Sequence, residues 1–291
     1  MFKFRRYGHW YFLSALALGV FVVWSAVFYA ESRRGRVFLH VLDVGQGDAI
    51  FIEAPGGNQA LVDGGPDNSV VARLGEVMPF WDNSIDLVVL THPHADHLDG
   101  LLEVIKRYDV GVIIESGVNH SIPEYAEWQK AIADKGIARL VARRGMIANL
   151  GGGAYLKVLS PFDSYENVTV RNVHDAAVVA KLEFASSTAL LMADAEAVLE
   201  RRLLAAGEDL NAEVLKVGHH GSKTSTLEMF LAAARPRFAV ISAGRNNRYG
   251  HPTQEVLDRL ADSGVRTFRT DQDGTVSFAS GGGYFVPDSN D

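Results

Sequence analysis

The longest apolar run in the chain lies near its N-terminus. Residues 10–30 contain no charged side chain, and about 20 apolar residues are what an α-helix needs to cross the hydrocarbon core of a bilayer. Trp10 and Tyr11 at one end and Tyr29 at the other suit the two membrane interfaces. The pattern predicts one transmembrane helix over about residues 10–30, within an N-terminal segment 1–36.

Basic residues flank this predicted helix on both sides. The preceding ones are Lys3, Arg5 and Arg6, and the following ones are Arg33, Arg34 and Arg36. The first group favours a cytoplasmic N-terminus, although the second group weakens the bias. A cleaved signal peptide is the alternative, but Phe28 before Ala30 fits a cleavage site poorly. We therefore predict a single-pass signal anchor in the cell membrane, with a catalytic domain outside the cytoplasm.

After a short linker over residues 31–36, strand and helix patterns alternate to the end of the chain. Apolar and β-branched runs bounded by Gly, Pro, Asn or Asp predict strands at 37–44, 49–54, 59–63, 87–91, 155–159, 178–184, 189–192, 214–217 and 238–242. Helical spacing predicts helices at 70–78, 98–108, 123–135, 195–206, 227–233 and 253–262. Two β-rich halves interleaved with helices indicate one mixed α/β domain over 37–291, with sheets packed together and helices outside.

Composition narrows the chemistry. The 291 residues include no cysteine, which excludes disulfides, thiolate metal sites and a cysteine nucleophile. Segment 1–36 has six basic residues and one acidic residue, a net charge of +5, so the chain total of −7 leaves −12 for the remainder. Such an acidic domain is a poor binder of long phosphate backbones through a basic surface. Any metal must therefore be held by histidine and carboxylate.

Four potential metal ligands follow one apolar strand directly. After the run 87–90 and Thr91 come His92, His94, Asp96 and His97. His92 and His94 are two residues apart, so an extended backbone points both to one side, whereas Asp96 and His97 lie where the next helix begins. Packing does not require three imidazoles in six residues. Imidazole and carboxylate suit zinc, and also iron, nickel or manganese.

At this point the sequence resembles the metallo-β-lactamase superfamily, whose central motif is His-x-His-x-Asp-His, and in particular its ComEC-type competence-protein branch. Five stretches appear in the order of that family and span nearly everything after Arg36. They are Leu42-Asp43-Val44-Gly45-Gln46-Gly47-Asp48-Ala49, Leu61-Val62-Asp63-Gly64-Gly65, the His92 motif, Leu215-Lys216-Val217-Gly218-His219-His220-Gly221-Ser222 and Tyr249-Gly250-His251-Pro252.

The resemblance implies a fold and a metal site. The fold is a four-layer αββα sandwich with two divalent metal ions at one edge, Zn²⁺ being expected and Mn²⁺ the alternative. His92 and His94 would hold the first ion, Asp96 and His97 the second, and Asp194 would bridge both. Asp194 can also be interpreted as an ordinary helix N-cap, and the two roles are compatible.

For the other candidate site residues, the sequence leaves more than one role open. One of His219 and His220 is expected to bind metal and the other to support it or touch substrate, and the sequence does not say which. His174 is either a further ligand or a surface loop residue. In the second case the first ion is less completely held, and a mononuclear site becomes an alternative. His251 resembles a family position at the mouth of the site, where it would donate a proton or hold an anionic oxygen, unless it only shapes a turn. Lys223 would meet a substrate phosphate or be merely solvated.

The remaining candidates have supporting or incidental interpretations. Asp43 and Asp63 are expected to support ligands or turns rather than to bind metal, and His9, His40 and His120 to be incidental. A metal-bound hydroxide, oriented by Asp96 or Asp194, is the implied nucleophile.

Three functional hypotheses remain open on the sequence. The first is a membrane-anchored phosphodiesterase or nuclease acting on single-stranded nucleic acid or a small anionic substrate, which the competence branch implies. With one expected span, the multi-helix channel of a full competence protein is not expected, so DNA uptake does not transfer with the motif. The second is hydrolysis of a small ester, lactone or lactam in the cell envelope. The third is a non-catalytic envelope protein with a degenerate site. No protein partner is predicted.

Overall fold

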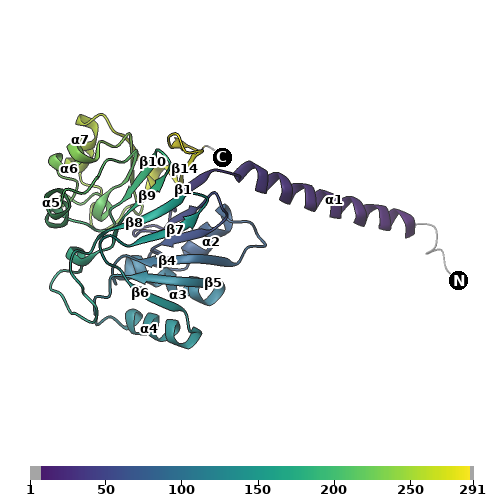
Figure 1. Ribbon diagram of the computed structural model, residues 1–291, viewed down its shortest axis with the longest axis horizontal. Coiled ribbons are helices and arrows are strands. Elements are labelled where there is room, and N and C mark those ends of the chain that lie inside the picture. Colours follow the sequence, from purple (N-terminus) through teal and green to yellow (C-terminus); the bar gives the residue numbers. More distant parts are fainter. Residues whose placement is uncertain (1–7, 289–291) are drawn as a thin grey trace.

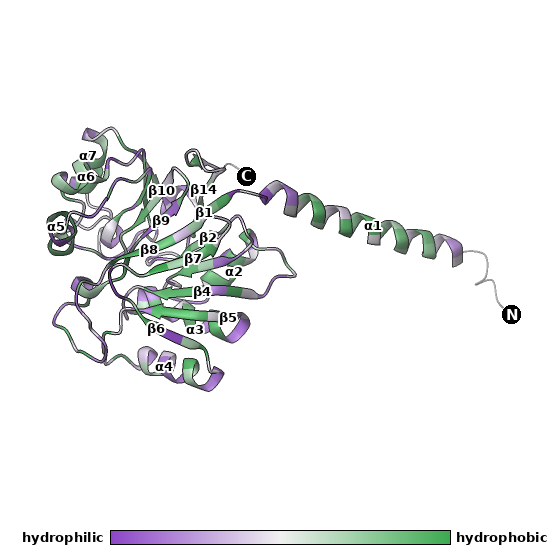
Figure 2. Cartoon of the chain, in the orientation of Figure 1, coloured by the Kyte–Doolittle hydropathy of each residue, from purple (hydrophilic) through white to green (hydrophobic). Residues whose placement is uncertain are grey.

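A computed structural model describes residues 8–288, apart from the side chains of residues 29 and 30. The chain begins with α1 (Gly8–Arg33), the one helix in the described part that is long and apolar enough to cross a membrane. It projects away from the rest of the chain (Figure 1), and Figure 2 shows apolar residues along most of its length. The expected apolar N-terminal helix is therefore confirmed as a candidate span. The basic residues Lys3, Arg5 and Arg6, on which the predicted topology depends, lie outside the described residues.

Two sheets follow. Within residues 8–288 the first has eight strands in the order β15-β14-β1-β2-β3-β4-β5-β6, and the second has seven in the order β13-β12-β11-β10-β9-β8-β7. The strands of the first sheet are β1 Val37–Val41, β2 Ile50–Glu53, β3 Gln59–Val62, β4 Ser84–Leu90, β5 Asp109–Glu115, β6 Ala138–Val141, β14 Val276–Ser280 and β15 Val286–Pro287. Those of the second are β7 Ile147–Gly151, β8 Ala154–Ser160, β9 Val179–Phe184, β10 Ser187–Leu191, β11 Val214–Lys216, β12 Phe238–Ile241 and β13 Arg266–Arg269.

Helices cover the outer face of each sheet. Those packed on the first sheet are α2 Ser69–Val77, α3 Ala95–Arg107 and α4 Pro123–Lys135. Those packed on the second are α5 Ala197–Ala205, α6 Glu228–Ala234 and α7 Gln254–Asp262. A short helix α8 (Thr270–Asp273) and two single 3₁₀ turns, η2 (Val173–Ala176) and η3 (Gly218–Gly221), complete the domain.

Alternating strand residues build separate hydrophobic layers. In β4, Leu87 and Val89 join the core between the sheets, whereas Val88 and Leu90 face the first set of helices. In β10, Leu191 faces the same central core and Leu190 faces the second set of helices. Successive side chains of a strand point to opposite faces, so a sheet buried on both sides is apolar throughout. The αββα sandwich expected from the sequence is confirmed.

The structure adds strands that the hydrophobic pattern does not reveal. Residues 138–141 and 147–151, which form β6 and β7, consist mostly of exposed and half-buried residues, with Leu150 as their one buried residue, and contain no long apolar run. Each of them lies at one edge of its sheet. β14 was also not predicted, and it returns from the C-terminal half of the chain to pair antiparallel with β1 in the first sheet.

Strand directions assign different roles to the two ends of the first sheet. β1 and β3 are each antiparallel to β2, and β3, β4 and β5 are mutually parallel. The carboxyl ends of β1, β3, β4 and β5 therefore lie together at one end of the sheet. Only three residues separate α1 from the start of β1, so α1 lies beside the opposite end. The motif after β4 is therefore at the end of the sheet remote from the helix.

His40, expected to be incidental, is a buried residue of β1. Its ring stacks between Phe38 and Phe51, with ring centroids 6.2 and 6.1 Å away. Nδ1 lies 2.8 Å from Ser277 Oγ, whereas Nε2 is buried without a hydrogen-bond partner. Burial, together with the nearby Arg33 charge, lowers the pKa of His40 from 6.5 to about 3. Its role is therefore in stability rather than in the functional site.

Replacement of His40 by Gln should reduce the acid sensitivity of the fold. Between pH 6.5 and about 3 the unfolded chain binds a proton at His40 that the folded chain does not, so stability falls as pH falls through this window. The wild type should lose about 2–3 kcal/mol more than His40→Gln between pH 7.5 and pH 4.5. Chemical unfolding of the full chain in detergent micelles at both pH values measures this difference, and equal losses would contradict it.

Candidate metal centre

His92 and His94, which follow β4, belong to the first of two groups in a cluster of histidines and aspartates. His92 Nε2 lies 3.1 Å from His94 Nδ1, and His174 Nε2 lies 3.3 Å from that same His94 atom. Asp194 Oδ2 is 3.7 Å from His92 Nε2 and 3.8 Å from His174 Nε2. These four side chains form a group close enough to hold one ion. His174, left open by the sequence, is brought to this group by η2.

A second group lies on the other side of Asp194. Asp96, in the first turn of α3, has Oδ2 3.5 Å from His220 Nε2. Asp194 Oδ1 lies 3.4 Å from both His97 Nε2 and His220 Nε2. Asp96, His97 and His220 are therefore the second set able to hold an ion. The two oxygens of one buried carboxylate face two different groups, which is the arrangement that a bridging ligand needs.

The two neighbouring histidines of η3 have different surroundings. Both adopt left-handed backbone angles, with φ of 47° at His219 and 53° at His220. His220 is buried within the second group, whereas His219 lies beside the first, with Nδ1 3.2 Å from Glu196 Oε1 and Nε2 3.7 Å from Asp194 Oδ2. A Cβ at Gly218 would approach the Ala195 carbonyl oxygen to 2.6 Å. This position therefore requires glycine for η3 to pack closely behind Asp194.

Hydrogen bonds fix the orientation of three of the rings. The Nδ1 atoms of His92, His97 and His220 lie 3.0, 2.7 and 3.1 Å from Thr91 Oγ1, Asp63 Oδ2 and the Ser242 carbonyl oxygen, respectively. With Nδ1 donating in each case, the lone pair of Nε2 points into the cluster. Such orientation by outer partners is characteristic of metal-binding histidines. The expected supporting role of Asp63 agrees with this contact.

Several polar atoms at the centre have no partner in the protein. The Nε2 atoms of His97 and His220 and the Oδ1 atom of Asp194 are buried without a hydrogen bond. Buried polar groups are nearly always satisfied, and these atoms converge on one point. A divalent cation between them would satisfy all three, so the residues present fit the metal centre that the sequence predicts.

The electrostatic balance of the centre also accommodates cations. Burial opposes the charge on Asp194, but His220 and His97 hold the pKa of this carboxyl well below its ordinary value. Burial likewise opposes protonation of His220, yet the Asp194 and Asp48 carboxylates raise the pKa of His220 to about 10. Protons on imidazoles thus balance the buried carboxylates in the protein alone. Metal ions would replace those protons, because imidazole binds metal in its neutral form.

Two contributors were missed by sequence reasoning. Lys216 Nζ donates to Asp48 Oδ2 at 2.7 Å, and both side chains are buried. Asp48 Oδ1 lies 3.4 Å from His220 Nδ1, and an oxygen of Asp48 groups with His97 and Asp194 as a further potential ligand set. The sequence feature that could have indicated Asp48 was the motif Gly47-Asp48. A Cβ at residue 47 would lie 2.1 Å from the Asp96 carbonyl oxygen, so glycine is required for this close approach.

The structure places three further residues of interest differently. His251 has its ring centroid 5.7 Å from that of His219, consistent with a position at the mouth. Lys223 is exposed and makes no side-chain hydrogen bond or ion pair within residues 8–288, so the structure does not bring it into the cluster. His120, expected to be incidental, has its ring centroid 5.7 Å from that of His94. It also lines a hollow of about 410 Å³ beside His94.

Comparison with known proteins agrees with this architecture. The family model described as Metallo-beta-lactamase superfamily matches residues 42–245. ComE operon protein 3 of Bacillus subtilis is 32% identical over 264 residues, which cover 85% of this chain and 33% of that protein. Competence protein ComA of Neisseria gonorrhoeae is 28% identical over 250 residues, covering 84% of this chain and 32% of that protein. Recombination protein 2 of Haemophilus influenzae is 32% identical over 225 residues, covering 75% and 26%.

The chain spans between about a quarter and a third of the length of these curated relatives. Among solved structures, YhfI from Bacillus subtilis has a TM-score of 0.57 at 12% identity, covering 84% of this chain and 99% of its own. Igni18 from Ignicoccus hospitalis has a TM-score of 0.54 at 16% identity, covering 83% and 98%. At such low identities these two structures bear on the fold alone.

Metal analysis of purified variants should distinguish the two groups. We expect about two divalent ions per wild-type chain, loss of about one ion in His220→Ala, and loss of both in Asp194→Ala, because Asp194 faces both groups. His120→Ala is the control, since it lies next to His94 but outside the ligand groups. Inductively coupled plasma mass spectrometry on folded protein gives the counts. Full metal content in Asp194→Ala would contradict the bridging role.

Proposed function

Because the chain belongs to the metallo-β-lactamase superfamily, we propose that it is a membrane-anchored, metal-dependent hydrolase of phosphodiester bonds. The observation that carries this proposal is the position of Asp194, with one oxygen directed at each of two ligand groups. Paired divalent ions stabilise both the attacking and the leaving oxygen in phosphoryl displacement. The competence proteins to which the chain is similar add support for a nucleic-acid substrate.

Each group would hold one ion, the first through His92, His94 and His174 and the second through Asp96, His97 and His220, with Asp194 between them. When bound, such ions polarise a phosphoryl oxygen and lower the pKa of coordinated water from about 15.7 to near 7. The chain itself orients the rings through their Nδ1 contacts. His251, beside His219, is proposed to hydrogen-bond an anionic oxygen of the substrate.

The hollow beside His94 supports an anionic substrate. The residues that line it include Asn119, His120, Arg171 and Asn172. Amide and guanidinium groups donate hydrogen bonds to phosphate oxygens, and arginine does so in a paired geometry. The strongly acidic remainder of the domain disfavours a long duplex. We therefore propose a single-stranded or short phosphodiester whose neighbouring phosphate lies in this hollow.

Anchoring is proposed to proceed through α1, which would span the bilayer. None of its most apolar part is buried in the protein, as expected of a helix whose partner is lipid. The catalytic domain would then remain at the membrane, outside the cytoplasm.

The purified full chain should hydrolyse bis(4-nitrophenyl) phosphate, and both a chelator and His94→Ala should abolish turnover. Both treatments remove the ions that supply the reaction chemistry. Release of 4-nitrophenol measures the rate, and restoration by Zn²⁺ or Mn²⁺ after chelation identifies the effective metal. Turnover of nitrocefin or a lactone without phosphodiester cleavage would instead favour the small-substrate hydrolase. Inertness at full metal content would favour a binding protein.

Replacement of Arg171 by Ala should weaken oligonucleotide binding without disabling the centre. We expect KM for a single-stranded oligonucleotide to rise about three- to tenfold, with kcat and the turnover of bis(4-nitrophenyl) phosphate little changed, since that small substrate has a single phosphate and no neighbouring phosphate to place in the hollow. Arg201→Ala, an exposed arginine on α5, is the matched control. An equal rise in KM in the control would indicate a general charge effect, and no rise in either would place the neighbouring phosphate elsewhere.

A further inference from the structure

A pair of aromatic residues forms the tip of the turn 79–82, which precedes β4. The Asp82 N–H donates to the Pro79 carbonyl oxygen at 2.9 Å and closes the turn. Phe80 and Trp81 are its two central residues, and their rings meet edge to face at 4.8 Å. Phe80 is 89% exposed and Trp81 52% exposed. Turn tips are usually occupied by Gly, Asn, Asp or Ser, so two exposed aromatic rings at this position require an explanation.

The turn is held rigidly from behind. Gln59 Nε2 donates to Asp82 Oδ2 at 2.6 Å, and the Ser84 N–H and hydroxyl donate to Asp82 Oδ1 at 3.1 and 2.9 Å. These bonds fix the base of the turn to the starts of β3 and β4. The aromatic tip is therefore presented by a preformed support.

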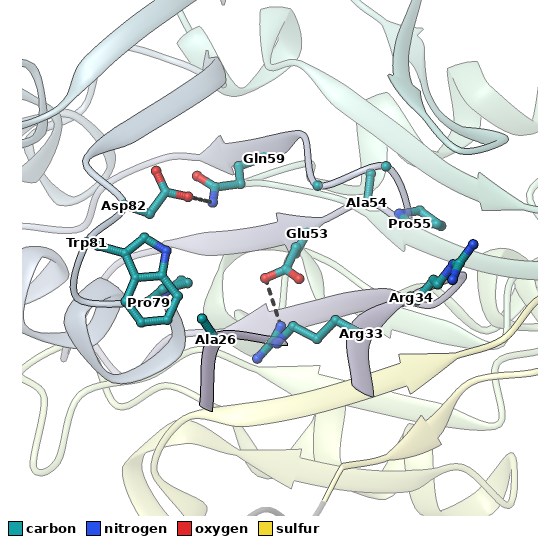
Figure 3. Close-up of a pocket in the computed structure, with 12 residues that line it drawn as sticks. Ala26, Arg33, Arg34, Glu53, Ala54, Pro55, Gln59, Pro79, Trp81 and Asp82 are labelled. Atoms are coloured by element: carbon teal, nitrogen blue, oxygen red, sulfur yellow. Dashed lines mark hydrogen bonds and ion pairs between the residues drawn. The ribbon is translucent and has the colours of Figure 1, made fainter. Parts of the chain in front are cut away.

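The turn lies beside the membrane-proximal part of α1. A pocket of about 440 Å³ lies between α1, the turn and the connection from β2 to β3. Figure 3 shows the residues that line it, which include Ala26, Arg33, Arg34, Pro79 and Trp81. Within residues 8–28, Ala26 is half-buried and all the other residues are exposed. Arg33 Nη1, at the end of α1, contacts Glu53 Oε2 of β2 at 2.8 Å. The helix is thus fixed against the same edge of the sheet that carries the turn.

The height of this contact along α1 corresponds to a membrane interface. Ala26 precedes the end of the uncharged run at residue 30 by four residues, which is about 6 Å of helix. If the run 10–30 occupies the hydrocarbon core, the aromatic turn meets the helix just inside its boundary, and the cations of Arg33 and Arg34 lie at the headgroups. Tryptophan and other amphipathic aromatic side chains concentrate at this level.

We propose that Phe80 and Trp81 enter the lipid interface alongside α1 and form a second, non-helical contact with the membrane. This inference rests on the proposed anchoring by α1. With α1 as the only contact, the domain can tilt together with the helix relative to the bilayer plane, whereas a second contact beside α1 limits this tilt and holds the same end of the sheet at the membrane. The metal centre then points away from the membrane, at the far ends of the parallel strands. β4 alone has seven residues, about 23 Å of strand.

Depth-dependent fluorescence quenching on the full chain tests this arrangement. The sequence has no cysteine, so Phe80→Cys, Val20→Cys in α1 and Met229→Cys on α6 each provide a single site for a bimane label. Met229 is 56% exposed and belongs to α6, which Figure 1 shows far from α1, so it is the matched surface control. The proteins are reconstituted in vesicles of phosphatidylethanolamine and phosphatidylglycerol, with quenchers in the upper acyl chain or, as iodide, in the water.

Lipid quenching of the label at residue 80 should exceed that at residue 229 several-fold and approach that at residue 20, with the opposite order for iodide. If residue 80 behaves as residue 229 does while residue 20 is quenched by lipid, anchoring stands and the aromatic contact is overturned. If the label at residue 20 is itself exposed to iodide and not to lipid, the proposed anchoring fails and the further inference fails with it.

Discussion

The buried carboxylate of Asp194 is the constraint on which the rest of the site depends. A charged carboxylate in a protein interior is costly unless cations or donors surround it. Asp194 follows β10 of the second sheet, whereas His92 and His97 follow β4 of the first. The ion-binding centre therefore exists only if the two sheets pack in one relative position. The apolar core between them, shared by Leu87, Val89 and Leu191, holds that position without contributing any ligand.

Residues that lie together in the sequence could be identified before the structure was known. His92, His94, Asp96 and His97 follow one strand, so their proximity is a local property of the backbone. His220 and His219 could not be separated in this way, because the alternation expected of a strand is replaced by two left-handed residues in η3. Lys216 and Asp48 meet across 168 positions, and no periodicity reveals such a pair. β6 and β7 were not predicted because each is short and has mostly exposed or half-buried residues, without a long apolar run.

Charge is distributed unevenly, and this distribution restricts the substrate. The domain after residue 36 is strongly acidic, whereas the residues at the end of α1 are basic. Association with nucleic acid through a broad electrostatic surface is therefore unfavourable, and long-range attraction would have to come from the ions and from local groups such as Arg171. The chain shares with its competence-protein relatives one module, which spans about a third of their length. In the proposed function this module acts on short or single-stranded substrate.

The topology also connects the membrane to the chemistry. Because β1 starts beside α1 and runs parallel to β3, β4 and β5, every ligand that follows one of these strands must lie at the end of the sheet away from the helix. Reversing that relation would require a longer connection than the three residues between α1 and β1. In the proposed anchoring through α1, the centre would therefore face the aqueous phase rather than lipid. A water-soluble phosphodiester can reach such a centre directly, whereas a lipid-embedded substrate would have to leave the bilayer first.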